Sequence, residues 1–177
     1  MALDPSSVDR PRRMRPGVRV AVVVSEFHEQ LTGAMLDSAR DELESSGLAP
    51  GDLQVAWVPG AFELPIVARR FARRDDIDAV LCFGLVLKGE TTHDHWVAHA
   101  ATQGILEASL ETDTPILFGV LTCNDLDQAK ARALPAEKGG REDKGREVAR
   151  AAIGVLAALD VADGIAVAEG SGEEAGR

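Results

Sequence analysis

The chain has 177 residues, of which 45% are hydrophobic and 27% are charged. This length suits one domain with a single core, and the composition is that of a globular protein rather than a disordered or fibrous one. The 29 acidic residues outnumber the 19 basic ones, giving a net charge of −10. Because this charge repels a phosphate backbone, it argues against nucleic acid as the main partner.

The two ends of the chain differ in composition from the rest. Residues 1–17 combine three prolines and four arginines without a periodic apolar pattern, which predicts a basic flexible arm. Residues 160–177 hold five acids and one base among glycines and alanines, which predicts an acidic flexible tail. We therefore expect one folded domain over residues 18–159.

Neither a targeting segment nor a membrane span is expected. The N-terminus carries Asp4 and Asp9 and lacks the apolar stretch of a secretory signal, and two cysteines give no disulfide framework. The longest uncharged apolar run, Ala79 to Leu87, is far shorter than the roughly 20 residues that a membrane-spanning helix needs. The expected location is the cytoplasm.

The first half of the domain alternates between strand and helix patterns. Val18 to Val24 is a β-branched run typical of a strand covered on both faces. Apolar residues at helical spacing follow from Leu31 to Leu43, and Gly47 stands where a left-handed C-cap would end that helix. Leu53 to Val58 reads as a second strand. Pro65 then opens a short helix that runs to about residue 73.

The second half repeats the alternation. Ala79 to Leu87 is the third strand, and the apolar residues from Trp96 to Ala108 make the stripe of the next helix. Pro115 to Leu121 is the fourth strand, and Asp125 to Leu134 is a helix. Lys144–Gly145 opens the final helix, whose apolar stripe runs from Val148 to Leu159. Strands alternating with helices predict an α/β protein: a parallel sheet with helices on both faces.

Ligands of such sheets bind beyond the carboxyl ends of the strands. Four segments follow the predicted strands: Ser25–His28, Pro59–Glu63, Lys88–His93 and Thr122–Asn124. In the first, Phe27 offers a ring that can stack on a planar heterocycle, or it packs the start of the helix against the core. In the third, Gly89 and the hydroxyls of Thr91 and Thr92 precede a helix N-terminus, which predicts a phosphate or carboxylate cradle.

Three of the four histidines cluster beside this cradle. His93 is best placed for proton transfer in carbonyl chemistry. Alternatively, His95 and His99, one helical turn apart, would bind a metal ion together with His93 or Asp94. The first interpretation is favoured, with no metal and no cofactor expected. Arg132, on the helix after the fourth strand, is able to grip a phosphate bidentately.

With these segments in place, the chain resembles the 6,7-dimethyl-8-ribityllumazine synthase family from about residue 18 to 159. The motifs that carry the resemblance are Phe27, Pro59–Pro65, Gly84, Lys88–His93, Phe118–Thr122, Gln128–Ala129, Arg132 and Lys144–Gly145. Their order and separations make the resemblance specific. It implies a flavodoxin-like three-layer sandwich with a four-stranded parallel sheet, and the condensation of 5-amino-6-(D-ribitylamino)uracil with 3,4-dihydroxy-2-butanone 4-phosphate.

The resemblance also implies a role for each site residue. The pyrimidine substrate would contact Phe27, Ala61, Phe62, Glu63, Leu85, Val86, Leu87 and Phe118. The butanone phosphate would contact Glu90, Thr91, Arg132 and Lys144. His93 would be the proton shuttle, and Phe118, Arg132 and Lys144 would come from the adjacent subunit.

Assembly follows from the same resemblance. It implies homopentamers, alone or as a decamer or a sixty-subunit shell, with sites between subunits, and it suggests riboflavin synthase as a partner. Three other functions stay open: a catalytically silent carrier or shell that binds a lumazine or flavin, a metal-dependent hydrolase using the histidine cluster, and a flavodoxin-like electron carrier. The joint presence of Thr91, His93 and Arg132 favours the enzyme.

Overall fold

Four parallel strands form a central sheet in the computed structural model, which describes residues 13–165. They are β1 (Val20–Ser25), β2 (Leu53–Val58), β3 (Ala79–Leu87) and β4 (Ile116–Cys123). Their spatial order is β2-β1-β3-β4, and all three pairings are parallel. This confirms the predicted four-stranded parallel sheet, with the strand order of flavodoxin-like folds.

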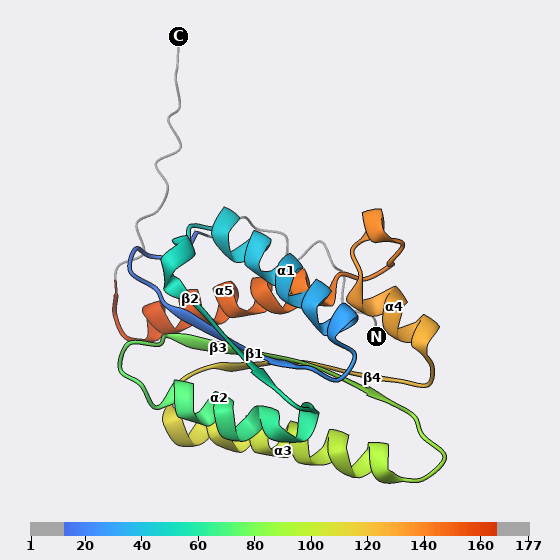
Figure 1. The fold of residues 1–177 in the computed structure, drawn as a ribbon. Coiled ribbons are helices and arrows are strands. Elements are labelled where there is room, and N and C mark those ends of the chain that lie inside the picture. Colours follow the sequence, from blue (N-terminus) through green and yellow to red (C-terminus); the bar gives the residue numbers. More distant parts are fainter. Residues whose placement is uncertain (1–12, 166–177) are drawn as a thin grey trace.

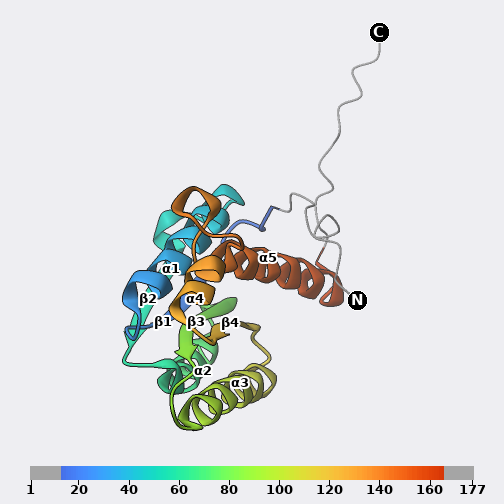
Figure 2. The same cartoon turned by 90° about the vertical axis from the view of Figure 1, so that its right-hand side faces the viewer.

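Helices cover both faces of the sheet, so the molecule has three layers (Figures 1 and 2). One face carries α1 (Glu29–Ser45), α4 (Leu126–Ala133) and α5 (Lys144–Ala162). The other carries α2 (Leu64–Ala72) and α3 (His93–Thr112). Three short 3₁₀ turns complete the described chain: η2 (Pro50–Asp52), η3 (Ala61–Glu63) and η4 (Ala136–Lys138). None of the helices within residues 13–165 combines the length and hydropathy needed to cross a bilayer.

Strand β1 shows why the strands of this protein are continuous apolar runs rather than alternating apolar and polar residues. Val20, Val22 and Val24 belong to the core under α1 and α5, whereas Ala21 and Val23 belong to the core above α2 and α3. Every residue of β1 is buried, as expected for a strand that is covered on both faces. α1 ends as predicted, because Gly47 has a φ of +108° directly after the C-cap.

Two local features differ from the sequence prediction. Trp96 was expected in the buried stripe of α3, but its side chain is 62% exposed, because it lies roughly 100° around the helix from Val97, which packs against the core. β4 extends two residues beyond Leu121, since Thr122 and Cys123 pair with the end of β3. The start of α5 at Lys144 agrees with the prediction that Lys144–Gly145 opens the last helix, and there the Asp143 carboxylate accepts a hydrogen bond from the Arg146 N–H.

The described parts of the predicted arm and tail contact the domain and each other. The Met14 N–H donates to the Ser46 carbonyl at 3.0 Å, and its side chain packs against the core. Arg15 binds Asp78, at the start of β3, and Asp160 of α5. Helix α5 itself continues to residue 162. The remaining predictions for the two ends fall on residues 1–12 and 166–177, outside the described residues.

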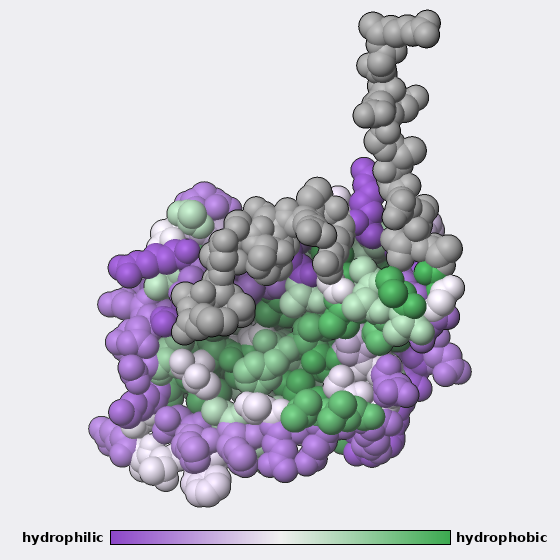
Figure 3. Space-filling view, turned by 180° about the vertical axis from the view of Figure 1, so that it is seen from behind, coloured by the Kyte–Doolittle hydropathy of each residue, from purple (hydrophilic) through white to green (hydrophobic). Residues whose placement is uncertain are grey.

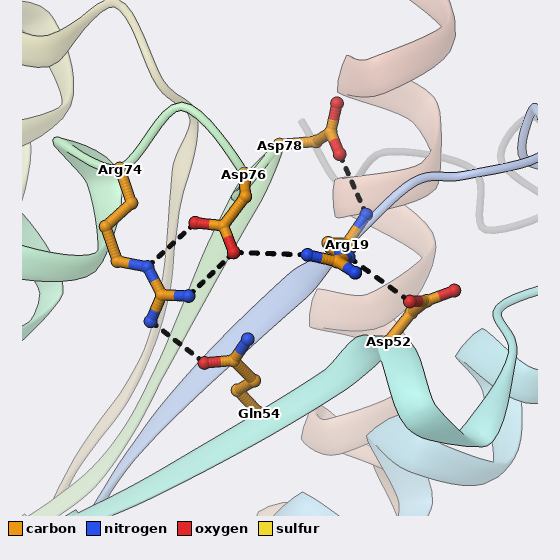
Figure 4. A network of polar contacts seen from close by, with 6 residues as sticks. All are labelled: Arg19, Asp52, Gln54, Arg74, Asp76 and Asp78. Atoms are coloured by element: carbon orange, nitrogen blue, oxygen red, sulfur yellow. Dashed lines mark hydrogen bonds and ion pairs between the residues drawn. The ribbon is translucent and has the colours of Figure 1, made fainter.

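A network of charged side chains joins the amino ends of the strands (Figure 4). The Arg19 guanidinium donates to Asp52 at 3.3 Å and to Asp76 at 3.2 Å, and its backbone N–H donates to Asp78 at 2.8 Å. Arg74 donates two hydrogen bonds to the Asp76 carboxylate, at 2.8 and 2.7 Å. These contacts connect β1, the β2 entry and the loop before β3 at the end of the sheet opposite to the predicted site.

This network predicts a pH-dependent contribution to stability from Asp76. The hydrogen bonds from Arg74 lower the pKa of Asp76 below its ordinary value of 3.8. A carboxyl group with a lowered folded pKa stabilises the fold above its ordinary pKa, and this contribution is lost as the pH falls through the folded value. Asp76→Asn should therefore lower the free energy of unfolding slightly at neutral pH, and the difference from wild type should disappear in strong acid. Urea unfolding across that pH range measures it.

The neighbouring Asp75 provides the control, because it is an exposed carboxylate outside the network. Asp75→Asn should leave the pH profile of stability nearly unchanged. A difference between Asp76→Asn and wild type that stays constant at every pH would contradict the assigned cause, because an effect unrelated to ionisation would not titrate.

Candidate active site

A cavity of about 620 Å³ opens at the carboxyl ends of β1 and β3, on the side of the sheet that carries α2 and α3. It is lined by Phe27, Gly60, Ala61, Phe62, Glu63, Leu85, Val86, Leu87, Gly89, Thr91, His93, Asp94 and Val97. These residues come from three of the four strand-end segments, the end of β3 and the first turns of α3. The structure thus brings together nine of the thirteen predicted site residues.

The turn after β1 places Phe27 at the cavity. The Glu26 and Phe27 N–H groups donate to the Val58 and Pro59 carbonyls, at 2.7 and 3.2 Å. The turn is therefore tied to the end of β2. The Phe27 side chain remains 66% exposed, which leaves its ring available to a flat ligand. It does not belong to either hydrophobic core cluster, so the alternative of a core-packing role is not observed.

The wall beside it comes from η3 and β3. Ala61 is buried and Phe62 is 61% exposed, although both line the cavity. A Cβ on Gly84 would lie 3.0 Å from Leu64 Cδ1 and 3.3 Å from the Ala61 Cβ. The missing side chain at Gly84 therefore allows the η3 turn to pack directly against β3. Leu85, Val86 and Leu87 then present an apolar surface to the ligand space.

The segment Lys88–His93 contributes the polar groups of the cavity. Residues 88–92 form an exposed loop, and His93 is the first residue of α3. The His93 N–H donates to the Thr91 hydroxyl at 3.4 Å. The first N–H groups of a helix lack intrahelical acceptors and favour an anion nearby. Thr91, His93 and Asp94 thus place a hydroxyl, an imidazole and a carboxylate around the end of the helix dipole.

Four predicted site residues do not line this cavity. Glu90 lies in the exposed loop beside Thr91, and Phe118 is 41% exposed on the edge strand β4. Arg132 is on α4, on the opposite face of the sheet, where its Nη1 donates to the Gln128 carbonyl at 3.4 Å. Lys144, at the start of α5, binds the Glu147 carboxylate at 2.6 Å. One copy of the chain therefore does not complete the predicted phosphate site.

Four cavity residues are not among the thirteen predicted site residues: Gly60, Gly89, Asp94 and Val97. Of these, the sequence placed Gly89 in the anion cradle and Asp94 in the alternative metal site. Gly60 and Gly89 stand inside segments that the strand-end rule had selected, so their positions carried the signal. Val97 follows His93 by four residues, and residues at this separation share a helix face. A smaller hollow of about 300 Å³ lies next to the cavity and shares Val86 and Asp94 with it.

The two other candidate chemistries can be compared with the geometry. The His95 and His99 rings are stacked, with their centroids 6.2 Å apart and an interplanar angle of 12°. Within residues 13–165, no three His, Cys, Asp or Glu side chains form a group that could hold a metal ion. Cys82 and Cys123 are buried free thiols. Burial raises the pKa of both, and the nearby Arg132 charge opposes this shift at Cys123.

The arrangement suits two ligands held side by side. An exposed ring and an apolar strand surface accept a flat heterocycle, and a helix N-terminus with a hydroxyl accepts an anionic group. The His93 imidazole lines the same cavity, and an imidazole can exchange protons near neutral pH. Such a site accelerates a condensation mainly by juxtaposing its reactants.

Comparison with known proteins points to one family. The family model described as 6,7-dimethyl-8-ribityllumazine synthase matches residues 17–160. A curated protein of that name from Thermus thermophilus is 41% identical over 157 residues, which cover 85% of this chain and 97% of the relative. A protein of the same name from Protochlamydia amoebophila is 40% identical over 142 residues, which cover 80% of either chain.

Proposed function

Because this chain belongs to the 6,7-dimethyl-8-ribityllumazine synthase family of riboflavin biosynthesis, we propose that it condenses 5-amino-6-(D-ribitylamino)uracil with 3,4-dihydroxy-2-butanone 4-phosphate. The products are 6,7-dimethyl-8-ribityllumazine, inorganic phosphate and water. As a member of that family the protein is an enzyme, and the reaction assigns it to the transferases. It acts in the cytoplasm on small-molecule substrates and uses no metal or cofactor.

The cavity residues carry out this reaction in a defined order. Phe27 stacks on the pyrimidine, while the surface of Leu85, Val86 and Leu87 confines it. The pyrimidine amine attacks the ketone carbon, and water leaves. His93 removes a proton, the carbon–oxygen bond to the phosphate breaks, and phosphate departs with the electron pair. The elimination leaves an enol, which tautomerises to a ketone. Attack of the second nitrogen on this new carbonyl closes the ring and releases a second water.

One observation carries this proposal: Phe27 from the segment after β1 and Thr91 and His93 from the segment after β3 line a single cavity. A carrier that only binds a flat ligand needs the aromatic ring and the apolar wall. It does not need a hydroxyl and an imidazole placed together at a helix N-terminus. Their combination fits a reaction in which an anionic group leaves and a proton moves.

The phosphate site is completed by a second copy of the chain. Arg132, Phe118 and Lys144 lie away from the cavity of their own copy, and β4 is an edge strand. Figure 3 views this side of the molecule and shows an apolar area there. Large side chains left exposed on α3, β4 and α5 include Leu106, Leu110, Phe118, Val155 and Leu159. Contiguous apolar surface of this kind is typical of a subunit interface.

The direction of this contact favours a closed ring. The surface around β4 meets the cavity of a neighbour rather than another β4 surface, so the contact is head-to-tail. Head-to-tail contacts close into rings when the rotation between copies permits it. A ring agrees with the assembly that the family resemblance implies, so we propose a homopentamer, alone or paired as a decamer or built into a sixty-subunit shell. Riboflavin synthase is the proposed partner that receives the product.

The proposal is tested by mixing purified protein with both substrates and following lumazine fluorescence. Wild type should form product far faster than the uncatalysed reaction. His93→Ala should lower kcat about tenfold or more, with little change in either KM, because a proton transfer is slowed while both binding surfaces remain.

Two results would contradict these roles. Wild type that binds the pyrimidine but shows only the background rate would be a silent carrier or shell. A wild-type kcat in His93→Ala would show that His93 does not transfer the proton. His99→Ala is the matched control, because His99 is another exposed α3 histidine that does not line the cavity, and this variant should keep the wild-type rate.

A further inference from the structure

His28 adopts an unusual backbone conformation next to the aromatic ring of the cavity. It is the N-cap residue of α1, with φ 64° and ψ 40° in the left-handed region. In the described part of the chain, Asp113 is the only other residue besides glycines with a positive φ. Most side chains disfavour this region for steric reasons. Strained positions of this kind cluster at functional sites, and an observed outlier is a reason to ask what its side chain does.

The backbone around His28 is held from two sides. Hydrogen bonds from Glu26 and Phe27 tie the turn to the end of β2. On the helix side, the buried Thr32 hydroxyl donates to the Ser25 carbonyl at 2.7 Å, and the Thr32 N–H donates to the His28 carbonyl at 3.1 Å. The turn therefore imposes the left-handed conformation whatever residue occupies position 28. Glycine would meet this backbone requirement with less strain than histidine.

The imidazole has a specific contact. Its ring lies edge-to-face with the Phe27 phenyl, with centroids 4.7 Å apart and an interplanar angle of 77°. His28 is half-buried and does not line the cavity, whereas Phe27 lines it with most of its ring exposed. The backbone of Phe27 is fixed by the turn, but the turn does not fix its side-chain torsions. The imidazole is thus placed to limit the orientations of the phenyl ring.

We propose that His28 positions Phe27, so that the phenyl ring is held ready to stack on the flat substrate. This inference rests on the proposed function for the identity of that substrate. His28 does not touch the substrate itself, and it acts through Phe27. Restricting the ring before binding lowers the entropy cost of stacking, so the contact improves affinity for the pyrimidine without affecting the phosphate-bearing substrate.

His28→Gly is the decisive variant, because glycine accepts the left-handed backbone and removes only the ring. The dissociation constant of the pyrimidine, measured by calorimetry without the second substrate, should rise about threefold to tenfold, the range of an aromatic pair. The KM for the pyrimidine should rise in parallel. The KM for the butanone phosphate, kcat and the melting temperature should stay near wild type. His28→Phe, which restores an aromatic ring, should recover much of the affinity.

A double-mutant cycle separates positioning from direct contact. Phe27→Ala alone should weaken pyrimidine binding, and adding His28→Gly to Phe27→Ala should cause no further loss. Two results would overturn the inference. One is wild-type affinity in His28→Gly. The other is a loss of affinity from His28→Gly that is as large in the Phe27→Ala background as in wild type. The second would mean that His28 contacts the substrate independently of Phe27.

A measurement without substrate keeps this inference separate from the proposed function. Phenylalanine rings are labelled with ¹³C, and the Phe27 signal among the five phenylalanines is identified by its loss in Phe27→Ala. In His28→Gly this signal should move toward the position of a freely rotating ring. An unchanged signal would overturn the positioning role. Wild type that neither binds the pyrimidine nor forms product, together with a shifted Phe27 signal, would reject the proposed function alone.

Discussion

Arg132→Ala should lower kcat/KM for the butanone phosphate about tenfold to a hundredfold, as expected for the loss of hydrogen bonds to a charged group. The KM for the pyrimidine should change little, because the aromatic and apolar walls are untouched. In one copy, the Arg132 guanidinium donates a hydrogen bond to the Gln128 carbonyl of its own helix. Its substitution should therefore leave the melting temperature near wild type. Steady-state kinetics with each substrate varied in turn measures the effect.

Two matched variants test whether the two parallel N–H donors of Arg132, rather than its positive charge alone, are needed. Arg132→Lys keeps the charge but loses the bidentate donor, so its activity should lie between wild type and Arg132→Ala. Arg40→Ala removes one positive charge from α1, where Arg40 pairs with Asp37 on the same helix, and should keep full activity. Equal losses in Arg40→Ala and Arg132→Ala would show that net charge, rather than a phosphate contact, causes the effect.

Oligomers assembled from two different variants test whether Arg132 binds the phosphate in the cavity of a neighbouring copy. One partner is a cavity variant, Phe27→Asp combined with His93→Ala, and the other is Arg132→Ala. Each alone should be nearly inactive. In assemblies with equal amounts of both, about a quarter of the sites would combine an intact cavity with an intact Arg132 from the next copy. If Arg132 acted on the cavity of its own copy, no site would be intact and no activity would return.

Gly145→Ala should lower the free energy of unfolding by about 3 kcal/mol or more, the upper range for overpacking in a core. Gly145 is buried in the first turn of α5, where a Cβ would overlap the Met35 carbonyl oxygen and lie 2.8 Å from its Cα. Both contacts are with backbone atoms, so α1 and α5 would have to separate. The helix-propensity gain of alanine, about 1 kcal/mol, is too small to compensate. Urea unfolding measures the loss.

Gly33→Ala is the matched control, since Gly33 lies inside α1 but has room for a side chain. A Cβ there would meet only Trp57 Cη2, at 3.7 Å, which is ordinary van der Waals contact. This variant should gain up to about 1 kcal/mol of stability from helix propensity. Similar gains in Gly33→Ala and Gly145→Ala would contradict the close approach of the two helices. Gly145→Ala should also reduce activity, because it displaces the neighbouring Lys144.

The sequence by itself determined the order of elements and most of their bounds. β2 and β3 begin and end where predicted, because Pro59 and Lys88 follow apolar runs whose lengths suit strands. The carboxyl ends of the predicted strands also indicated the three segments that line the cavity, since parallel strands place these ends at one edge of the sheet. Glycine at position 47 indicated the end of α1, because a left-handed C-cap favours that residue.

Only the tertiary structure decided features that depend on contacts between distant segments. Thr122 and Cys123 belong to β4 because β3 offers them pairing partners, which local polarity does not reveal. Trp96 is exposed because packing selects one side of α3, and a hydrophobic residue just off that side has nothing to bury it. The contact of Gly145 with Met35 and the separation of Arg132 from its own cavity follow from how the layers stack. Local periodicity determines which residues form an element, but the neighbours of an element depend on the whole chain.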